Sequence, residues 1–322
     1  MTDAPRATAP RFTILVAAYQ AESTIREALF SLTAQSYPNW EAIVVDDGSS
    51  DATALIACGC AREDNRIRVY RRSNAGPALA RNVAAEAARA PWLLALDADD
   101  SLLPCALERQ AAFMEAHPGF DIYSLGTLLQ DPDGSRRPWS VSSAHSGIES
   151  FTLDQMIEEN LLTVTTVVSA ERFRQLGGFR DLYLEDYDLW LRAFAAGSRH
   201  LHNPDPLAVY RVSQTSKNAN FERRMASADA VLTDLARSPG LDRRQRRNAL
   251  RRARLHRALG VRRHLEERLD QGETHRILRD YLSTADAYPN RLKWLGGVLL
   301  VCLCPRLFAR LAPRLQTGSS NV

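Results

Sequence analysis

Short strands alternate with helices through the first hundred residues, and this alternation constrains the fold more than any other feature. Four runs rich in apolar and β-branched residues predict buried strands, at 12–17, 40–45, 67–70 and 92–96. The stretches between them carry apolar residues three or four positions apart, which is typical of one helix face, at 22–35, 51–60 and 77–89. This order predicts an α/β fold with a Rossmann-like, mostly parallel sheet flanked by helices.

The pattern is looser beyond residue 100. It predicts helices and strands separated by a polar loop: helices at 103–117 and 185–196, strands at 121–129, 164–169 and 207–212, and the loop at 131–147. From about residue 221 the chain is predicted to be helical and is rich in arginine. We therefore expect a disordered lead-in at 1–10, a catalytic α/β domain at 11–220 and a basic helical appendage at 221–322.

Charge is unevenly distributed along the chain. Residues 1–221 contain 20 Lys and Arg against 28 Asp and Glu, a net −8, whereas residues 222–322 contain 21 against 10, a net +11. This asymmetry predicts different partners for the two parts. Five scattered cysteines predict reduced thiols, and the first ten residues lack the apolar core of a secretion signal, so we expect a cytoplasmic protein.

Three carboxylates follow the fourth expected strand within four positions, at Asp97, Asp99 and Asp100. Like charges this close disfavour joint ionisation, and a divalent cation relieves that repulsion. Asp97 and Asp99 lie two residues apart, on the same side of an extended chain, which favours them as ligands of Mn²⁺ or Mg²⁺. The alternative is an acidic helix start, in which Asp100 or Ser101 caps the following helix.

Other polar groups also follow expected strands or begin helices. The acids of Asp46-Asp47-Gly48-Ser49 can accept hydrogen bonds from a base or ribose, although a self-bonded turn is the plainer interpretation. Arg81 lies in an Ala-rich helix and can fork onto a diphosphate, unless this is only a helix start. Glu185 and Asp186 favour a helix N-terminus electrostatically, and one of them can also serve as a general base.

Together these segments resemble the inverting family 2 glycosyltransferases, over about residues 11–220. The family's motifs occur here in their usual order: Ala18-Tyr19, Asp46 to Ser49, Asn74 to Asn82, Leu96 to Asp100, Gly177-Gly178-Phe179 and Glu185-Asp186. The resemblance implies a GT-A fold and inverting transfer of one sugar from a nucleotide-diphosphate sugar, with a UDP-sugar preferred. It implies a role in bacterial surface polysaccharide or glycoconjugate synthesis. The Gln-x-x-Arg-Trp motif of processive synthases is not found, which favours single-sugar transfer.

The resemblance also implies a role for each matching residue on the nucleotide side. The backbone near Ala17 and the ring of Tyr19 would border the base. Asp47 would bond the base, with Asp46 the less favoured partner. Arg81 would neutralise charge on the departing diphosphate, the kind of electrostatic help that often dominates catalysis.

On the reacting side, the resemblance implies that Asp97 faces the ribose and the metal and that Asp99 is the firmer metal ligand. Asp186 would deprotonate the acceptor hydroxyl. Contacts to donor or acceptor are expected at Glu185, Arg211 and Ser213. Ser213 stands where many relatives carry a metal- or diphosphate-binding His, so weaker metal binding is expected. Gln20 replaces an Asn that is common in relatives.

The basic C-terminal part suggests a further partner. Residues 237–263 hold eleven Arg and one acid, which indicates either a solvated helix face or a surface for anionic lipid. Nucleic-acid binding is not expected, because no aromatic interleaving accompanies the arginines. The apolar and amphipathic segment 291–315 is too short to span a bilayer and either lies in the membrane interface or packs on the protein. We therefore expect a glycan or lipid-linked acceptor, an anionic membrane contact through 237–315, and a peripheral location on the inner face of the cytoplasmic membrane.

Rival functions leave different marks in a sequence. A catalytically silent nucleotide-sugar-binding scaffold would keep Asp47 and the metal pair, but the intact Asp186 argues against it. A dinucleotide-dependent oxidoreductase would need a Gly-x-Gly-x-x-Gly turn after the first strand, and the residues from Ala17 onward do not provide one. A glycoside hydrolase needs no nucleotide site.

Overall fold

The computed structural model describes residues 9–139, 144–212 and 220–270, with side chains up to Gly260. The chain divides into two compact units, Met1–Ser216 and Lys217–Val322. The expected lead-in at 1–10 lies almost entirely outside the described residues, as do Ser213 and the segment 291–315. The predicted domain bounds of 11–220 and 221–322 stay predictions.

The first half of unit 1 is the predicted parallel sheet. Strand β1 (Phe12–Ala18) pairs in parallel with β2 (Trp40–Asp46) and with β4 (Trp92–Asp97), and β2 pairs in parallel with β3 (Ile67–Arg71). The crossovers contain α1 (Ile25–Thr33), α2 (Thr53–Glu63) and α3 (Pro77–Glu86). Each predicted element is present with ends shifted by a few residues, which confirms the α/β fold class.

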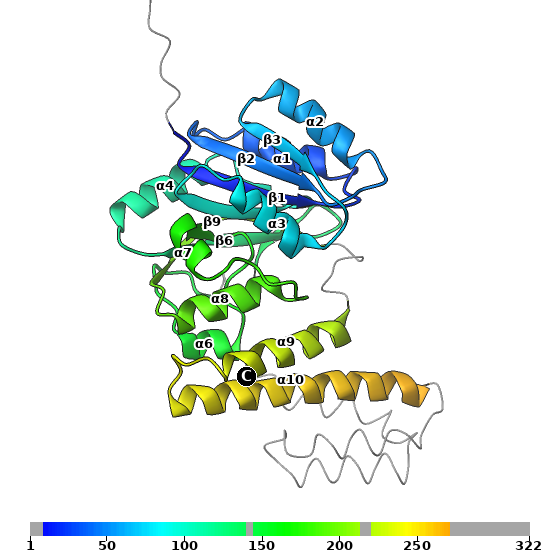
Figure 1. Cartoon of the computed structure of the whole chain (residues 1–322), viewed down its shortest axis with the longest axis vertical. Helices are drawn as coiled ribbons and strands as arrows, with labels where there is room; N and C mark the ends of the chain where they lie inside the picture. The colour runs from blue at the N-terminus through cyan, green and yellow to red at the C-terminus, as the bar shows by residue number, and fades with distance from the viewer. Residues whose placement is uncertain (1–8, 140–143, 213–219, 271–322) are drawn as a thin grey trace, which may run out of the picture. The chain divides into compact units, whose positions relative to one another are not determined.

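The second half extends this sheet with shorter and partly antiparallel strands. The strand order is β3-β2-β1-β4-β8-β6-β9-β5, with β7 paired to β6. The strands are β5 (Ser101–Leu102), β6 (Ile122–Gln130), β7 (Arg136–Pro138), β8 (Val167–Ser169) and β9 (His200–Arg211). The helices are α4 (Ala106–Ala116), α6 (Leu153–Glu158), α7 (Ala170–Gln175) and α8 (Glu185–Ala195). Figure 1 shows the helices of unit 1 arranged around the sheet.

Two expectations for this half were wrong in detail. Strand β9 begins at His200, seven residues before the expected start, and β7 lies within the expected polar loop. The early part of β9 contains Pro204 and Pro206, which disguise a strand. It pairs with β6 through register shifts at Gly126, where a Cβ would lie 2.6 Å from the carbonyl oxygens of residues 204 and 205. Only glycine allows that approach.

Alternation along β1 explains how the sheet is covered. Phe12, Ile14 and Val16 are fully buried and belong to one apolar cluster with Leu29 and Leu32 of α1. The same cluster includes residues of α2 and α4, so these helices share one face of the sheet. Helix α3 contacts β1 and β2 but contributes nothing to that cluster, which places it on the opposite face.

Unit 2 is helical over its described residues, as expected for the basic appendage. Helix α9 (Phe221–Leu235) packs along α10 (Arg243–Asp270), where Met225 lies against His256 and Gly260 and Asp229 pairs with Arg257. Among the helices in the described part of the chain, none combines the length and apolar character needed to cross a bilayer.

Candidate active site

The carboxyl ends of three parallel strands meet at one edge of the sheet. Ala18 at the end of β1 pairs with Asp46 of β2, and Ala17 pairs with Asp97 of β4. The predicted nucleotide and metal residues, far apart in sequence, therefore lie at the same edge. Ligands in open α/β sheets bind beyond this edge.

Asp47 anchors the loop that leads into α3. Its side chain is 2% exposed, its Oδ2 accepts a hydrogen bond from the main-chain N of Gly76 at 2.7 Å, and Arg72 Nε lies 3.3 Å from its Oδ1. Gly48 beside it has φ +81°, and a Cβ there would lie 2.8 Å from the N of Asn74. The self-bonded turn is made by Asp46, whose Oδ1 accepts a hydrogen bond from the N of Ser49 at 3.3 Å, whereas Asp47 binds the distant loop at 75–76. The predicted contact of Asp47 with the base stays a prediction.

The ends of β1 and β2 bring Tyr19, Gln20 and Asp46 close to the same turn. Tyr19, next to the end of β1, is 54% exposed, and its predicted contact with the base stays a prediction. Asp46 is fully buried, with Arg71 Nε 3.0 Å from its Oδ2. Gln20 adopts φ +50°, and its Oε1 accepts a hydrogen bond from the N of Ser50 at 2.9 Å. The Gln side chain thus joins the turns after β1 and β2.

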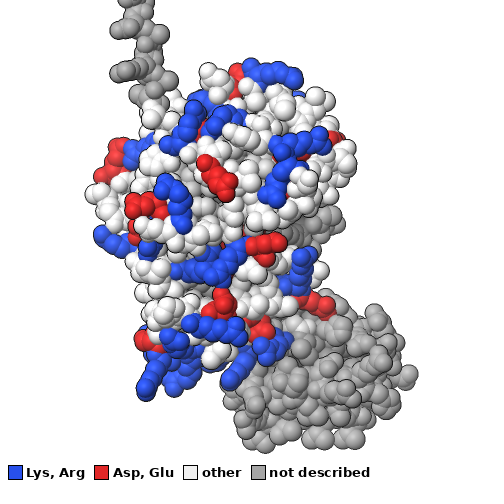
Figure 2. All heavy atoms as spheres, in the orientation of Figure 1, with Lys and Arg blue, Asp and Glu red and all other residues white. Residues whose placement is uncertain are grey.

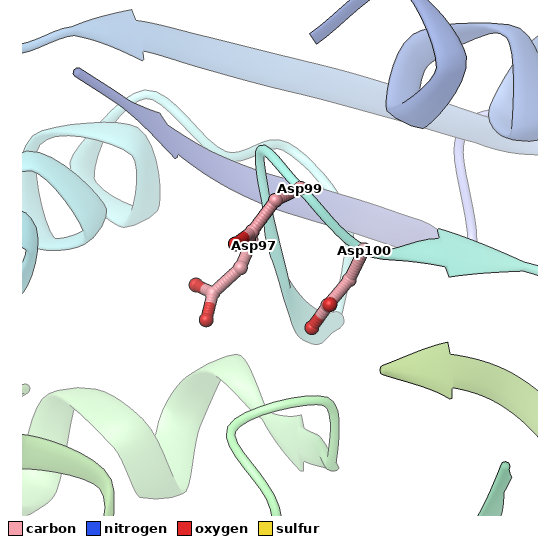
Figure 3. Close-up of side chains that lie close together, drawn as sticks. All are labelled: Asp97, Asp99 and Asp100. Atoms are coloured by element: carbon pink, nitrogen blue, oxygen red, sulfur yellow. The ribbon is translucent and has the colours of Figure 1, made fainter. Parts of the chain in front are cut away.

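The end of β4 and the turn that follows it, residues 97–100 and called the acidic turn below, bring three carboxylates together as a candidate ion site. One oxygen from each of Asp97, Asp99 and Asp100 lies within 4.8 Å of the others, and Figure 3 shows the three carboxyl groups on one side of the turn. Burial and the charge of Asp97 raise the pKa of both Asp99 and Asp100. The helix-start alternative is wrong, because the chain enters β5 and α4 begins only at Ala106.

Asp100, which the sequence did not single out as a ligand, is held from β9. Its Oδ1 accepts a hydrogen bond from the main-chain N of Arg211 at 2.9 Å, and Arg211 Nε donates to the carbonyl of Asp99 at 3.1 Å. The Arg211 guanidinium also binds Glu27 of α1. Arg211 thus fixes the acidic turn, while its expected contact with donor or acceptor stays a prediction.

This donor set fits a hard divalent cation. Carboxylate oxygens are the ligands that Mg²⁺ and Mn²⁺ prefer. Burial first and repulsion from Asp97 second raise the pKa values of Asp99 and Asp100, and a bound cation would relieve that repulsion. Asp97 and Asp99 remain accessible to solvent, so an ion could also keep water or substrate ligands.

Arg81 lies between the acidic turn and α8. Its guanidinium is 3% exposed, binds Asp97 through Nη2, and places Nη1 2.8 Å from Oε1 of Glu185. Burial alone would lower the pKa of Arg81, but the Asp97 and Glu185 carboxylates outweigh it and raise the pKa. Both Arg81 and Glu185 are therefore committed to a buried ion pair, and their predicted ligand contacts stay predictions.

Asp186 occupies the first turn of α8. Burial and the adjacent charge of Glu185 raise the pKa of its carboxyl to about 6, against a lowering by the hydrogen bond from Tyr187 N at 2.8 Å. A carboxylate with a pKa near the working pH is suited to accept a proton. The negative charge of Asp97 also raises the pKa of Asp186, so the acidic turn influences the protonation of the candidate base.

Two sets of contacts that hold α8 and the segment before it were not predicted from the sequence. Asp188 is buried, and Arg192 Nε binds its Oδ2 at 2.8 Å while Arg192 Nη2 donates to the carbonyl of Gly178 at 2.7 Å. The spacing of four between Asp188 and Arg192 on a helix was the available signal. The second support, Asn82, pairs with Phe179, and no local pattern reveals a pair 97 residues apart.

The family model for glycosyl transferase family 2 matches residues 13–174. A putative glycosyltransferase of Bacillus subtilis, EpsE, is 31% identical over 222 residues, covering 67% of this chain and 76% of that protein. The chain belongs to glycosyl transferase family 2. This glycosyltransferase is also similar to the putative teichuronic acid biosynthesis glycosyltransferase TuaG of B. subtilis, at 29% identity over 66% of this chain and 82% of that protein.

Solved structures share the fold of this family 2 enzyme. Residues 1–349 of S. aureus TarS in complex with UDP-GlcNAc superpose with a TM-score of 0.69 at 20% identity, covering 96% of this chain and 92% of that one. The mannosyltransferase PcManGT from Pyrobaculum calidifontis, in complex with GDP-Man and Mn²⁺, has a TM-score of 0.62 at 18% identity, covering 97% and 86%. The predicted GT-A fold and family are confirmed, and the enzyme is an inverting glycosyltransferase.

Proposed function

We propose that this enzyme transfers one sugar from a UDP-sugar to an acceptor hydroxyl during assembly of a bacterial surface polysaccharide, with Mn²⁺ or Mg²⁺ bound at Asp97 and Asp99. The observation that carries the proposal is the gathering of Asp97, Asp99 and Asp100 at the strand edge that also holds Asp47. Names of relatives support the process: TuaG is named for teichuronic acid, and Rhizobium meliloti ExoO for succinoglycan biosynthesis.

Each side chain has a task in the proposed reaction. Asp47 and Tyr19 hold the base, and Asp186 accepts the proton of the acceptor hydroxyl. The hydroxyl oxygen forms a bond to the anomeric carbon as the bond to the diphosphate oxygen breaks on the opposite face, which inverts that carbon. The cation, when bound, neutralises charge on the departing diphosphate. A pKa of about 6 leaves Asp186 largely ionised at neutral pH, which disfavours the silent scaffold as the alternative.

A thermal-shift screen tests the donor and the metal together. We expect a UDP-sugar to raise the melting temperature more with Mn²⁺ than without it, and we expect GDP- and dTDP-sugars to act weakly. For Asp99→Asn, we expect the UDP-sugar to raise the melting temperature by the same amount with and without Mn²⁺. If no nucleotide sugar produces a metal-dependent shift in the wild-type chain, the proposal fails.

The acceptor and location are proposed from relatives and from charge. Two E. coli relatives, 27% identical, are named as glucosyltransferases acting on a diphosphoundecaprenol-linked sugar. A lipid-linked glycan acceptor would bring this enzyme to the inner face of the cytoplasmic membrane, and α10 offers a cationic surface for it. Arg243, Arg247 and Arg254 are exposed and share one stripe of the helix, with exposed Leu250 between them. Figure 2 shows basic side chains gathered where α10 begins.

A further inference from the structure

Two motifs of the sequence have no task in the proposed reaction, and the structure joins them. The side-chain amide of Asn82 on α3 donates from Nδ2 to the carbonyl of Phe179 at 2.8 Å and accepts from the N of Phe179 at Oδ1, at 2.9 Å. One side chain thus satisfies both main-chain groups of a residue 97 positions away. Such a paired bond fixes both the position and the orientation of the Phe179 peptide groups.

Gly178 makes this pairing sterically specific. It has φ +70°, and a Cβ added to it would lie 2.6 Å from Oδ1 of Asn82 and 3.2 Å from the ring of Phe173. Any other residue would be strained in this conformation and would displace the amide. The Gly-Gly-Phe motif therefore exists to let the segment approach α3 closely.

The neighbouring residue of α3 ties the other end of the same segment. Arg81 binds Glu185 at 2.8 Å, and Asp186 follows directly in the first turn of α8. Arg81 also lies against the ring of Phe179, 5.6 Å from its centroid. Two consecutive residues of α3 thus hold both ends of the segment 179–185 that delivers Asp186.

We infer that Asn82 is a positioning residue that, together with Gly178, sets the place of Asp186 relative to the acidic turn; this rests on the proposed function, in which Asp186 is the base. Helix α3 starts at the loop that Asp47 fixes, so the same helix connects the predicted base-binding acid to the predicted catalytic base. A displacement of the order of 1 Å in such a site can cost about a hundredfold in rate.

The experiment compares Asn82→Ala with Asn203→Ala as a matched control. Asn203 is a buried Asn that also makes two hydrogen bonds, to Gln110 and to the N of Asp205, but it lies in β9. Hydrogen–deuterium exchange is measured over 178–187 without any ligand. Release of UDP from the UDP-sugar that passes the thermal screen gives kcat and the donor KM.

We expect Asn82→Ala to speed exchange in 178–187 and to lower kcat about tenfold to a hundredfold with donor KM nearly unchanged. Asn203→Ala should change neither. Gly178→Ala acts from the other side of the same contact and should reproduce the kcat loss even if Asn82→Ala folds poorly. The inference is overturned if exchange or kcat is unchanged in both Asn82→Ala and Gly178→Ala. It is also overturned if Asn203→Ala loses as much kcat as Asn82→Ala does. If the wild-type chain turns over no donor, the proposed function fails, and the ligand-free exchange alone decides whether Asn82 holds the segment.

Discussion

Nη1 of Arg81 lies 2.8 Å from Oε1 of Glu185, a buried ion pair across 104 residues of sequence, and the same guanidinium binds Asp97. Removing the guanidinium would take away the positive charge between the buried carboxylate of Glu185 and the partly exposed carboxylate of Asp97, and breaking a buried ion pair in this way typically costs about 3–5 kcal/mol. We predict that Arg81→Met lowers the free energy of unfolding by about this amount in urea denaturation. Adding Glu185→Gln should recover part of the loss, and a loss of equal size in the double variant would contradict the ion-pair explanation.

Asp186 sets a pH dependence for transfer. Burial and Glu185 raise the pKa of its carboxyl to about 6, and a base must be ionised to accept a proton, so kcat should fall as pH drops through about 6. Asp186→Asn should abolish transfer while donor binding, measured by thermal shift, persists. The neighbouring carboxylate variant Asp181→Asn, at an exposed position, is the control. Normal turnover by Asp186→Asn would refute the base assignment.

If the acidic turn binds the metal, substitutions within it should weaken Mn²⁺ binding and a substitution elsewhere should not. Asp99→Asn removes an accessible ligand, and Asp100→Asn removes a buried carboxylate that Arg211 orients, so each should weaken Mn²⁺ binding by about tenfold or more in calorimetry. Asp64→Asn, in the loop that enters β3 at the opposite edge of the sheet, should bind Mn²⁺ as the wild type does. Equal affinity in all three variants would remove the turn as the metal site.

Local periodicity in the sequence predicted most strands and helices of the fold, but few of the side-chain contacts in the site. The parallel half was predictable because strands β1 to β4 and helices α1 to α3 each show their own period in sequence. The early part of β9 was not, because extra residues of β9 opposite Gly126 of β6, together with two prolines, break that period. The sequence offered Asp100 only the alternative role of a helix cap, because its partner, the main chain of Arg211, lies 111 residues away. Motif order located the site, whereas packing determined which acids are paired.

A buried histidine pair predicts acid sensitivity of the fold. Ser124 Oγ lies 2.8 Å from His200 Nε2 and 2.8 Å from His202 Nδ1, and both rings stack on Phe151. Burial, with a contribution from His202, lowers the pKa of His200 to about 3, and burial lowers that of His202.

The unfolded chain therefore binds more protons than the folded one below about pH 6.5, and stability falls as pH drops from there toward the folded pKa. For His200 alone the loss at pH 5 is about 2 kcal/mol, from a difference of about 1.5 pH units below the ordinary pKa. Urea denaturation at pH 7 and pH 5 measures it. His200→Asn should show a smaller difference between the two pH values, and an identical difference would rule out His200 as the source.

The cationic stripe of α10 predicts salt-sensitive membrane binding. Arg257 at the edge of the stripe is paired with Asp229, whereas Arg243, Arg247 and Arg254 form the exposed stripe itself. Each basic residue near an anionic surface contributes about 1 kcal/mol, and salt screens the attraction. We expect the full chain to float with phosphatidylglycerol vesicles at low salt and to release at high salt.

Reversing the three stripe arginines to Glu should abolish flotation. The matched control reverses three exposed arginines of unit 1 and so changes the net charge equally: Arg26, Arg62 and Arg174. Because bulk charge is the same in the two variants, loss of flotation in the stripe variant alone assigns the contact to α10. Equal loss in both variants would show that net charge, not the stripe, drives binding, and flotation of the stripe variant at the wild-type level would exclude α10 as the membrane contact.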